Sequence, residues 1–294
     1  MKNKKIAILI SVLLVCAMSI AAFTACDKNA EKSINVIGRD STSGTREAFE
    51  SLIKNSDGTK LEGKMTQKAE ELEATSAVIA KVQSNKTAIG YISLGSLDDS
   101  VKAVKVNGVA PTVENVQNGS YVLYRPFVIL TNKTLTEEDN LTAATKDFLN
   151  YLKSDKASKI VADNGFVPNT DNNQTFSSDK SAGTVIIRGS TSVEKVMTIL
   201  MDGYKKLNPN VTFDINCQGS GAGRTAAKDD TAGNVIGMSS SAIKAEDAGY
   251  FAQFDLAQDA VVVIVNKANA IDNLTIQNLY DIYTGAVTRF SEIA

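Results

Sequence analysis

The sequence predicts an α/β fold, and two features of the chain carry that prediction. From Ser33 onward, short apolar runs of strand length alternate with amphipathic stretches of helical length. One apolar run, residues 260–265, is rich in valine and has no polar side chain, which is typical of a strand buried on both faces. Alternation of this kind is expected from strands that are separated by helices.

The individual elements follow from the spacing of apolar residues and from stop signals at Gly165 and Gly285. Strands are expected at residues 34–37, 88–92, 121–131, 184–187, 211–215, 235–236 and 260–265. Helices are expected at residues 47–54, 74–83, 141–164 and 193–207, from Arg224 onward, and at 274–283. Residues 169–183 hold one large apolar side chain among many turn formers, so they are predicted to be a flexible linker.

The N-terminal residues predict export and attachment to a membrane. Three lysines within the first five residues precede an apolar run from Ile6 to Phe23, which indicates a signal peptide at 1–25. Cys26 resembles the lipobox cysteine of bacterial lipoproteins, whose thiol is acylated, so residues 26–33 would form a lipid-anchored tether. An uncleaved signal anchor is the alternative, because the run approaches spanning length. In both cases the folded part lies on the extracytoplasmic face of the cell membrane.

Charge and cysteine content exclude several classes of protein. The net charge of -2 becomes more negative by three when the signal lysines leave, so nucleic acid is not an expected partner. A mature body of roughly 268 residues is enough for one large or two medium domains. Cys16 lies in the signal and Cys26 is the lipidation site, which leaves Cys217 alone and excludes a disulfide framework.

The sequence contains no histidine. This removes Ser-His-Asp and Cys-His catalysis and every metal site that uses histidine. A phosphate-binding P-loop is also missing, because Gly63-Lys64 is followed by Met65. We therefore expect no enzyme, no catalytic residue, no cofactor and no metal site.

Three predicted corners between a strand and a helix share one composition. Residues 37–45, 186–192 and 218–223 each pass through glycine and hydroxyl residues directly into a helix. A helix start offers unpaired backbone N–H groups and a partial positive charge, and glycine lets the backbone approach a ligand closely. Arg39 would add a full charge in a fork that fits two oxygens. Together the corners predict a site for a small anion.

The energetics allow such a site without a cluster of lysines. Each helix dipole contributes about 0.3–1 kcal/mol when exposed and up to about 2 when partly buried. Charge-assisted hydrogen bonds add about 1.5–3 kcal/mol each, so several together reach micromolar affinity, about -8 kcal/mol. Taken singly, each corner is an ordinary N-cap. Arg46 and Arg224 are expected to be solvated or ion-paired, and Ser43, Ser190 and Ser220 lack a base that would make them nucleophiles.

Several motifs resemble the phosphate-binding proteins of bacterial ABC phosphate importers. In the second half of the chain they are residues 189–194, 218–223, 236–240, 261–267, 273–275, 283–285 and 290–293. In the first half they are Arg39 with residues 43–46, and residues 88–95, 118–121, 125–127 and 165–168. The resemblance covers nearly the whole mature chain.

The resemblance implies a two-lobe periplasmic-binding-protein fold of type II, with the two halves in exchanged order. In that family, the half that corresponds to Gly189-Ser190-Thr191-Ser192 comes first, whereas here it comes second. This order suggests a circular permutation. A truncated tandem gene or an assembly error is the alternative. One lobe would comprise residues 34–125 plus 266–294, and the other residues 126–265, including the linker at 169–183.

By position in the family, the resemblance implies a set of ligand-binding residues. They are the hydroxyl of Thr191 and the backbone at Ser192, together with Ser220, Arg39, Ser43, Gly44 and Thr45; Ser239 is a weaker candidate.

Two positions differ from the family pattern. An aspartate that precedes Ile236-Gly237 in the family is Val235 here, and an acid two residues after Arg39 is Ser41, although Asp40 is adjacent. A buried carboxylate accepts the proton of phosphate and rejects sulfate, so weaker exclusion of sulfate is expected.

The implied function is a monomeric, lipid-anchored protein that captures phosphate or a related tetrahedral oxyanion between its lobes for an ABC permease. An anion sensor or scavenger without a transport role is one alternative. An extracellular phosphatase-like enzyme and a nonfunctional fragment are the others.

Overall fold

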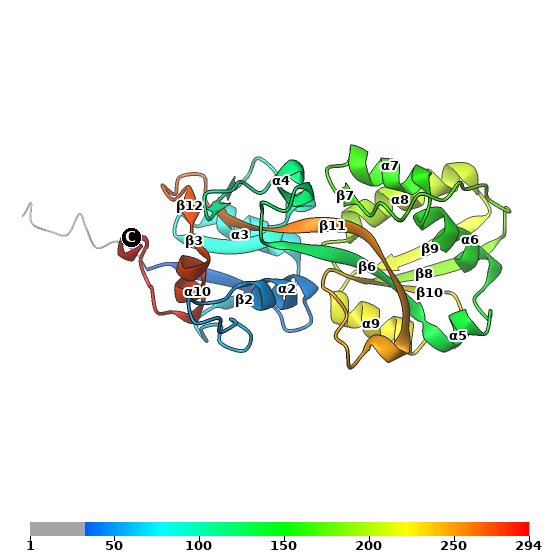
Figure 1. Ribbon diagram of the computed structural model, residues 1–294, viewed down its shortest axis with the longest axis horizontal. Helices are drawn as coiled ribbons and strands as arrows, with labels where there is room; N and C mark the ends of the chain where they lie inside the picture. The colour runs from blue at the N-terminus through cyan, green and yellow to red at the C-terminus, as the bar shows by residue number, and fades with distance from the viewer. Residues whose placement is uncertain (1–32, 294) are drawn as a thin grey trace, which may run out of the picture. The chain divides into compact units, whose positions relative to one another are not determined.

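A computed structural model describes residues 33–293 (Figure 1). Residues from Ile34 onward form one compact unit. The predicted signal peptide and the lipidation site Cys26 lie outside the described residues. No helix within 33–293 is long and apolar enough to cross a membrane.

The elements alternate as the sequence predicts, and the mixed α/β class is confirmed. The strands are β1 (Asn35–Arg39), β2 (Glu70–Leu72), β3 (Ala88–Ser93), β4 (Lys102–Ala103), β5 (Lys105–Val106), β6 (Tyr124–Asn132), β7 (Val167–Pro168), β8 (Gly183–Gly189), β9 (Val211–Asn216), β10 (Val235–Ser239), β11 (Phe251–Val265) and β12 (Asn273–Leu274). The α-helices are α2 (Gly44–Leu52), α3 (Thr75–Ser84), α4 (Val113–Gln117), α5 (Lys133–Glu137), α6 (Ala143–Leu152), α7 (Asp155–Asp163), α8 (Glu194–Leu207), α9 (Ser220–Lys228) and α10 (Ile276–Thr284). Short 3₁₀ turns are η1 (Leu94–Ser96), η2 (Ala248–Tyr250) and η3 (Phe290–Glu292).

One sheet runs in the order β2-β1-β3-β11-β6-β10-β8-β9. β1 pairs in parallel with β2 and β3, and β8 pairs in parallel with β9 and β10. Between these parallel groups, the long strands β6 and β11 lie side by side in antiparallel pairing (Figure 1). The carboxyl ends of β1 and β8 therefore lead into their helices from the two sides of this antiparallel pair.

The apolar side chains form two large core clusters. The first gathers side chains of β1, β3, α2, α3 and α10, and the second those of β8, α6, α7 and α8. β11 contributes to both, with Leu256 and Ala257 in the second cluster and residues 260–265 in the first. The lobe boundary expected after Val265 therefore does not follow the packing, and the division into two lobes stays a prediction.

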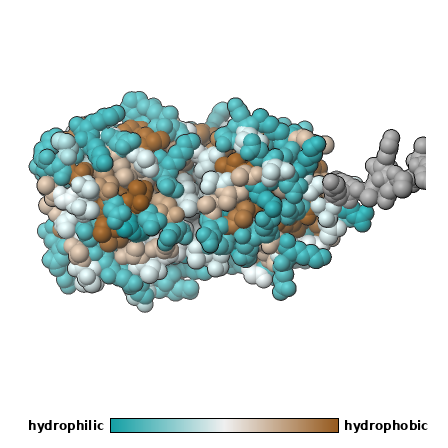
Figure 2. All heavy atoms as spheres, turned by 180° about the vertical axis from the view of Figure 1, so that it is seen from behind, coloured by the Kyte–Doolittle hydropathy of each residue, from teal (hydrophilic) through white to brown (hydrophobic). Residues whose placement is uncertain are grey.

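The surface is mixed in polarity. Hydrophilic and hydrophobic residues alternate over the face drawn in Figure 2. Among the described residues, the exposed large apolar side chains are Val122, Tyr124 and Tyr250.

Several predicted boundaries are wrong, for identifiable reasons. The single helix expected at 141–164 is two helices, because the buried Ser154 caps α7 by accepting a hydrogen bond from the Ala157 amide. The helix expected from Arg224 begins at Ser220, so the glycine-rich segment is itself the first turn of α9. β11 is longer than its apolar part, because the residues after Phe251 alternate between half-buried and exposed positions, as on one strand with a solvated face.

The predicted flexible linker at 169–183 is held in place. It contains no helix, and only its last residue, Gly183, belongs to a strand. The side chain of Asn172 donates to the carbonyl of Asp255 at 2.9 Å, and the buried Phe176 ring packs 5.4 Å from that of Tyr151. These contacts hold the segment against β11 and α6, so it is not the flexible linker that the sequence predicts.

The C-terminal segment completes the first cluster without a covalent link to β1. The backbone N–H of Ile34 donates to the carbonyl of Thr288 at 2.7 Å. The ring of Phe49 stacks on Tyr91 at 4.1 Å and meets Tyr283 of α10 edge-on at 4.7 Å. This aromatic group joins α2, β3 and α10.

The aromatic group predicts a large loss of stability on truncation. Phe49→Ala should lower the free energy of unfolding by about 3–5 kcal/mol, because it opens a cavity between α2 and α10. Tyr250→Ala removes a ring that is 47% exposed and serves as the control. Urea denaturation measures both variants, and equal losses would contradict the assigned packing.

Candidate anion-binding site

Arg39 is the central cation of the site. It ends β1 and is 1% exposed. Its guanidinium donates to two carbonyls that precede α3, Leu72 at 3.0 Å and Glu73 at 2.5 Å, and its backbone N–H donates to the Tyr91 hydroxyl at 3.1 Å. A fourth interaction reaches across the sequence, because Nη2 donates to Thr191 Oγ1 at 3.2 Å. The Arg39 corner and the Thr191 corner therefore meet.

Hydroxyl groups from separate elements surround this guanidinium. Thr45 of α2 and Ser192 join their hydroxyls at 2.9 Å. The Thr75 hydroxyl at the start of α3 lies 3.3 Å from Thr191 Oγ1 and accepts from Arg39 Nη1, also at 3.3 Å. Each hydroxyl has rotatable donor and acceptor capacity, so it can exchange a neighbouring hydroxyl for an oxygen of an anion.

A second set of hydroxyls adjoins the first. Ser190 donates to the Ser240 hydroxyl at 2.8 Å, and the Ser240 amide donates to Ser220 Oγ at 3.0 Å. A Cβ atom on Gly44 would lie 2.2 Å from Ser220 Oγ, so only glycine lets the start of α2 come this close. We call Thr45, Thr75, Ser190, Thr191, Ser192, Ser220 and Ser240 the hydroxyl cluster.

Helix starts supply further donors. The N-cap residues of α3, α8 and α9 are Ala74, Val193 and Gly219, and none of them makes a side-chain cap hydrogen bond. Thr75, Ser192 and Ser220 of the hydroxyl cluster lie next to these caps in the sequence, near the partial positive charge of each helix. Ser43 differs, because its hydroxyl caps α2 by accepting from the Arg46 amide at 3.3 Å.

The charges near the cluster favour an anion. Burial lowers the pKa of the Arg39 guanidinium, but an arginine side chain stays protonated at neutral pH. Arg46 pairs with Glu50 at 2.7 Å and with Glu71 at 2.6 Å, and Arg224 pairs with Glu47 at 3.1 Å. Among residues 33–293, Arg39 has no such ion-pair partner within 4 Å. Its charge is therefore available to a ligand.

The structure brings most of the predicted ligand residues together. Arg39, Thr45, Thr191, Ser192 and Ser220 belong to one network, and Gly44 approaches it closely. Ser43 is buried beside them as a cap.

Ser239 does not join the hydroxyl cluster, because its hydroxyl donates to the carbonyl of Ser241 at 2.9 Å. Its neighbour Ser240 occupies the cluster instead. The sequence also did not predict that Ser190 and Thr75 belong to the cluster. Thr75 follows Ala74 at a helix start without any glycine, so the corner composition that marked the other segments was missing there.

The expectation about sulfate loses its structural basis. Val235 begins β10 and pairs with Ile186, whereas the hydroxyl cluster lies beyond the other end of that strand. Four residues of strand span roughly 13 Å, so the side chain at 235 is not part of the site. Ser41 is exposed. Neither departure from the family pattern therefore alters a group that contacts the cluster.

A surface pocket of about 370 Å³ borders Thr75 and Thr191, with Lys195 and Cys217 also in its wall. Desolvation and the charge of Glu194 raise the pKa of the Cys217 thiol to about 12, so the thiol is protonated at neutral pH. Within 33–293, no group of three or more His, Cys, Asp or Glu residues is arranged to hold a metal ion.

The model of the family described as "PBP superfamily domain" matches residues 18–156 and 174–292. The chain belongs to the PBP superfamily. It is similar to the phosphate-binding protein PstS 2 of Streptococcus pneumoniae TIGR4, at 36% identity over 271 residues, which are 92% of this chain and 90% of that protein. The PstS 2 protein of Streptococcus agalactiae serotype V is 35% identical over 286 residues, 94% of each chain.

One solved structure and one further sequence match add to these comparisons. The crystal structure of a phosphate-binding protein of a phosphate ABC transporter from S. pneumoniae TIGR4 has 36% identity and a TM-score of 0.68, over 89% of this chain and all of that one. The match to PstS of Bacillus subtilis is shorter, with 31% identity over 48% of this chain and 43% of that protein.

Proposed function

We propose that the chain captures phosphate, or a closely related tetrahedral oxyanion, for an ABC importer. The observation that carries this proposal is the meeting of Arg39 with the Thr191 corner, at 3.2 Å, inside the hydroxyl cluster. A buried guanidinium, hydroxyls and helix starts together suit a small anion that must be desolvated on every side. The names of the full-length relatives support phosphate as the anion and a permease as the partner.

The proposed role is binding without catalysis. The serines of the hydroxyl cluster bond to other hydroxyls and amides, and the sequence has no histidine to act as their base. The relatives that cover most of the chain carry names of binding proteins. A sensor or scavenger would use the same site. Only a transport protein would also dock to a permease, so a docking measurement distinguishes the two roles.

The ligand residues in this proposal are Arg39, Gly44, Thr45, Thr191, Ser192 and Ser220, with Ser43 as a supporting cap. To them we add Thr75, Ser190 and Ser240, which the hydrogen bonds join to the same network. An anion would take the place of hydroxyl-to-hydroxyl contacts such as that between Thr45 and Ser192.

Replacement of Arg39 tests this assignment. Arg39→Met should weaken phosphate binding by roughly 10–100-fold, because charge-assisted hydrogen bonds contribute about 1.5–3 kcal/mol. Arg188→Met is the matched control, since Arg188 lies near the end of β8, as Arg39 does in β1, but pairs with Asp214 at the surface. Titration calorimetry measures both, with a thermal melt to verify folding. Equal affinity in the two variants would place the phosphate elsewhere.

We also propose that the two halves of the chain are exchanged relative to PstS proteins such as that of B. subtilis. The nearly complete matches to PstS 2 proteins and the half-length match to the B. subtilis protein support this, as does the hydrogen bond between Ile34 and Thr288. We further propose that the chain forms two lobes, each built around one of the two core clusters.

A rearranged chain tests the exchange. Joining residue 293 to Ile34 and opening the chain within 169–183 should give a protein that folds and keeps its phosphate affinity, because Ile34 bonds to Thr288 close to the junction and residues 169–183 contain no helix. A rearranged protein that melts without cooperativity would refute the exchange.

We propose that the protein is a monomer on the extracytoplasmic face, anchored through acylated Cys26. The apolar run and the cysteine support this arrangement. Cys26→Ser should move the protein from the membrane fraction to the medium or periplasm, and a variant that stays membrane-bound would point to the signal-anchor alternative.

A further inference from the structure

Arg125, at the beginning of β6, is a buried cation with one unused donor. The residue is 2% exposed. Its Nε and Nη2 atoms donate to Asp259 Oδ2 on β11, at 3.1 and 3.0 Å, and Asp259 also accepts from the Ser93 hydroxyl. Nη1 is buried and, within 33–293, has no hydrogen-bond partner. Leaving such a donor unpaired costs stability, so a group that accepts from it would be favoured.

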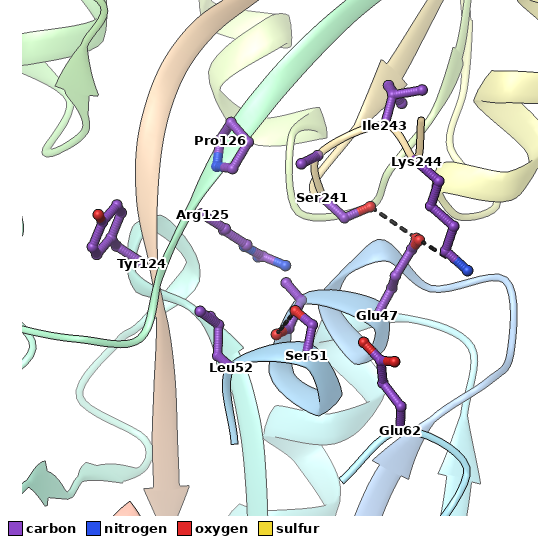
Figure 3. Close-up of a pocket in the computed structure, with 12 residues that line it drawn as sticks. Glu47, Ser51, Leu52, Glu62, Tyr124, Arg125, Pro126, Ser241, Ile243 and Lys244 are labelled. Atoms are coloured by element: carbon purple, nitrogen blue, oxygen red, sulfur yellow. Dashed lines mark hydrogen bonds and ion pairs between the residues drawn. The ribbon is translucent and has the colours of Figure 1, made fainter. Parts of the chain in front are cut away.

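The residue that carries this donor borders a pocket. Arg125 is part of the wall of a pocket of about 290 Å³ between α2, the start of β6 and residues 241–244. In Figure 3 the Arg125 side chain runs from β6 toward α2 and ends near Ser51. The volume is just below the usual range of ligand pockets, so it suits a molecule of a few heavy atoms.

The walls combine apolar surface with few free polar groups. Ala48, Leu52, Pro126 and Ile243 provide the apolar part. The Ser51 hydroxyl donates to the carbonyl of Ala48 at 2.9 Å, which leaves its oxygen able to accept or share a further hydrogen bond.

The carboxylates at the pocket are already paired or open to solvent. Glu47 accepts from Arg224 at 3.1 Å and from the Ser241 hydroxyl at 2.9 Å, and Lys244 lies 3.8 Å away. Figure 3 shows the interactions of Glu47 with Ser241 and Lys244 on one side of the pocket. The Glu62 carboxylate is more than half exposed and Lys244 is also exposed. The unpaired buried group is therefore Nη1, a donor of the guanidinium that Asp259 pairs through its other two nitrogens.

We propose that this pocket is a second ligand site, which binds a small aliphatic carboxylate. The carboxylate accepts a hydrogen bond from Arg125 Nη1, and the short apolar tail packs on Leu52, Pro126 and Ile243. A phosphate dianion fits this chemistry less well than a monoanionic carboxylate, because most of the wall is apolar and Glu47 would repel two negative charges more strongly than one. The residues that line the pocket include no member of the hydroxyl cluster.

Isobutyrate is the probe, titrated into the full chain by calorimetry. Ser51→Phe fills the pocket without changing Arg125. Ser84→Phe is the matched control, because the Ser84 hydroxyl in the last turn of α3 donates to the carbonyl of Lys81 as Ser51 does to Ala48. We expect saturable binding in the wild type and in Ser84→Phe, and at least tenfold weaker binding in Ser51→Phe.

Two further measurements identify the donor. Arg125→Lys keeps a charge for Asp259 but lacks the Nη1 donor, so isobutyrate affinity should fall while a folded melt is retained. Isobutanol, which has the same tail without the charge, should bind more weakly than isobutyrate to the wild type. Absence of saturable isobutyrate binding in the wild type would overturn the proposal. Equal binding in Ser51→Phe and Ser84→Phe would do the same. If Arg125→Lys fails to fold, the comparison of Ser51→Phe with Ser84→Phe still decides.

Discussion

The structure depends on the burial of the Arg39 guanidinium at the end of β1. A buried charge is costly unless hydrogen bonds surround it, and two carbonyls, the Thr75 hydroxyl and Thr191 meet that need. The carbonyls belong to the segment that leads from β2 into α3, and Thr191 belongs to the segment that leads from β8 into α8. One side chain thus fixes the relative positions of two helix starts that are far apart in the sequence, and it leaves a positive charge among their donors.

The rest of the architecture supports this meeting point. β6 and β11 pair along their length and carry the parallel group of β1 to β3 on one side and that of β8 to β10 on the other. The ion pair between Arg125 and Asp259 links these two strands inside the molecule. The contact of Ile34 with Thr288 and the packing of Tyr283 on Phe49 allow β1 to begin beside a segment that comes last in the sequence. The site therefore forms from the whole unit rather than from one half of it.

The corners could be predicted because their chemistry is local. Hydroxyl and glycine residues between a strand and a helix mark Ser43 to Thr45, Thr191 to Ser192 and Ser220, and all of these lie in or beside the cluster. Thr75 could not be found in this way, because its role comes from the tertiary approach of α3 to the Thr191 corner. Ser239 and Ser240 are chemically identical in sequence, and only their backbone directions decide which one joins the cluster. The break at Ser154 and the long β11 likewise depend on hydrogen bonds and pairing partners that a linear pattern does not contain.

The central claim is that the starts of α3, α8 and α9 surround one anion, and hydrogen exchange tests it most directly. Backbone amides of these three first turns should exchange more slowly when phosphate is added, because phosphate oxygens accept from them or hold the cluster closed. The amides of α6 and α7, in the second core cluster, should keep their rates apart from any global stabilisation. Unchanged exchange at the three helix starts in the presence of saturating phosphate would contradict the account.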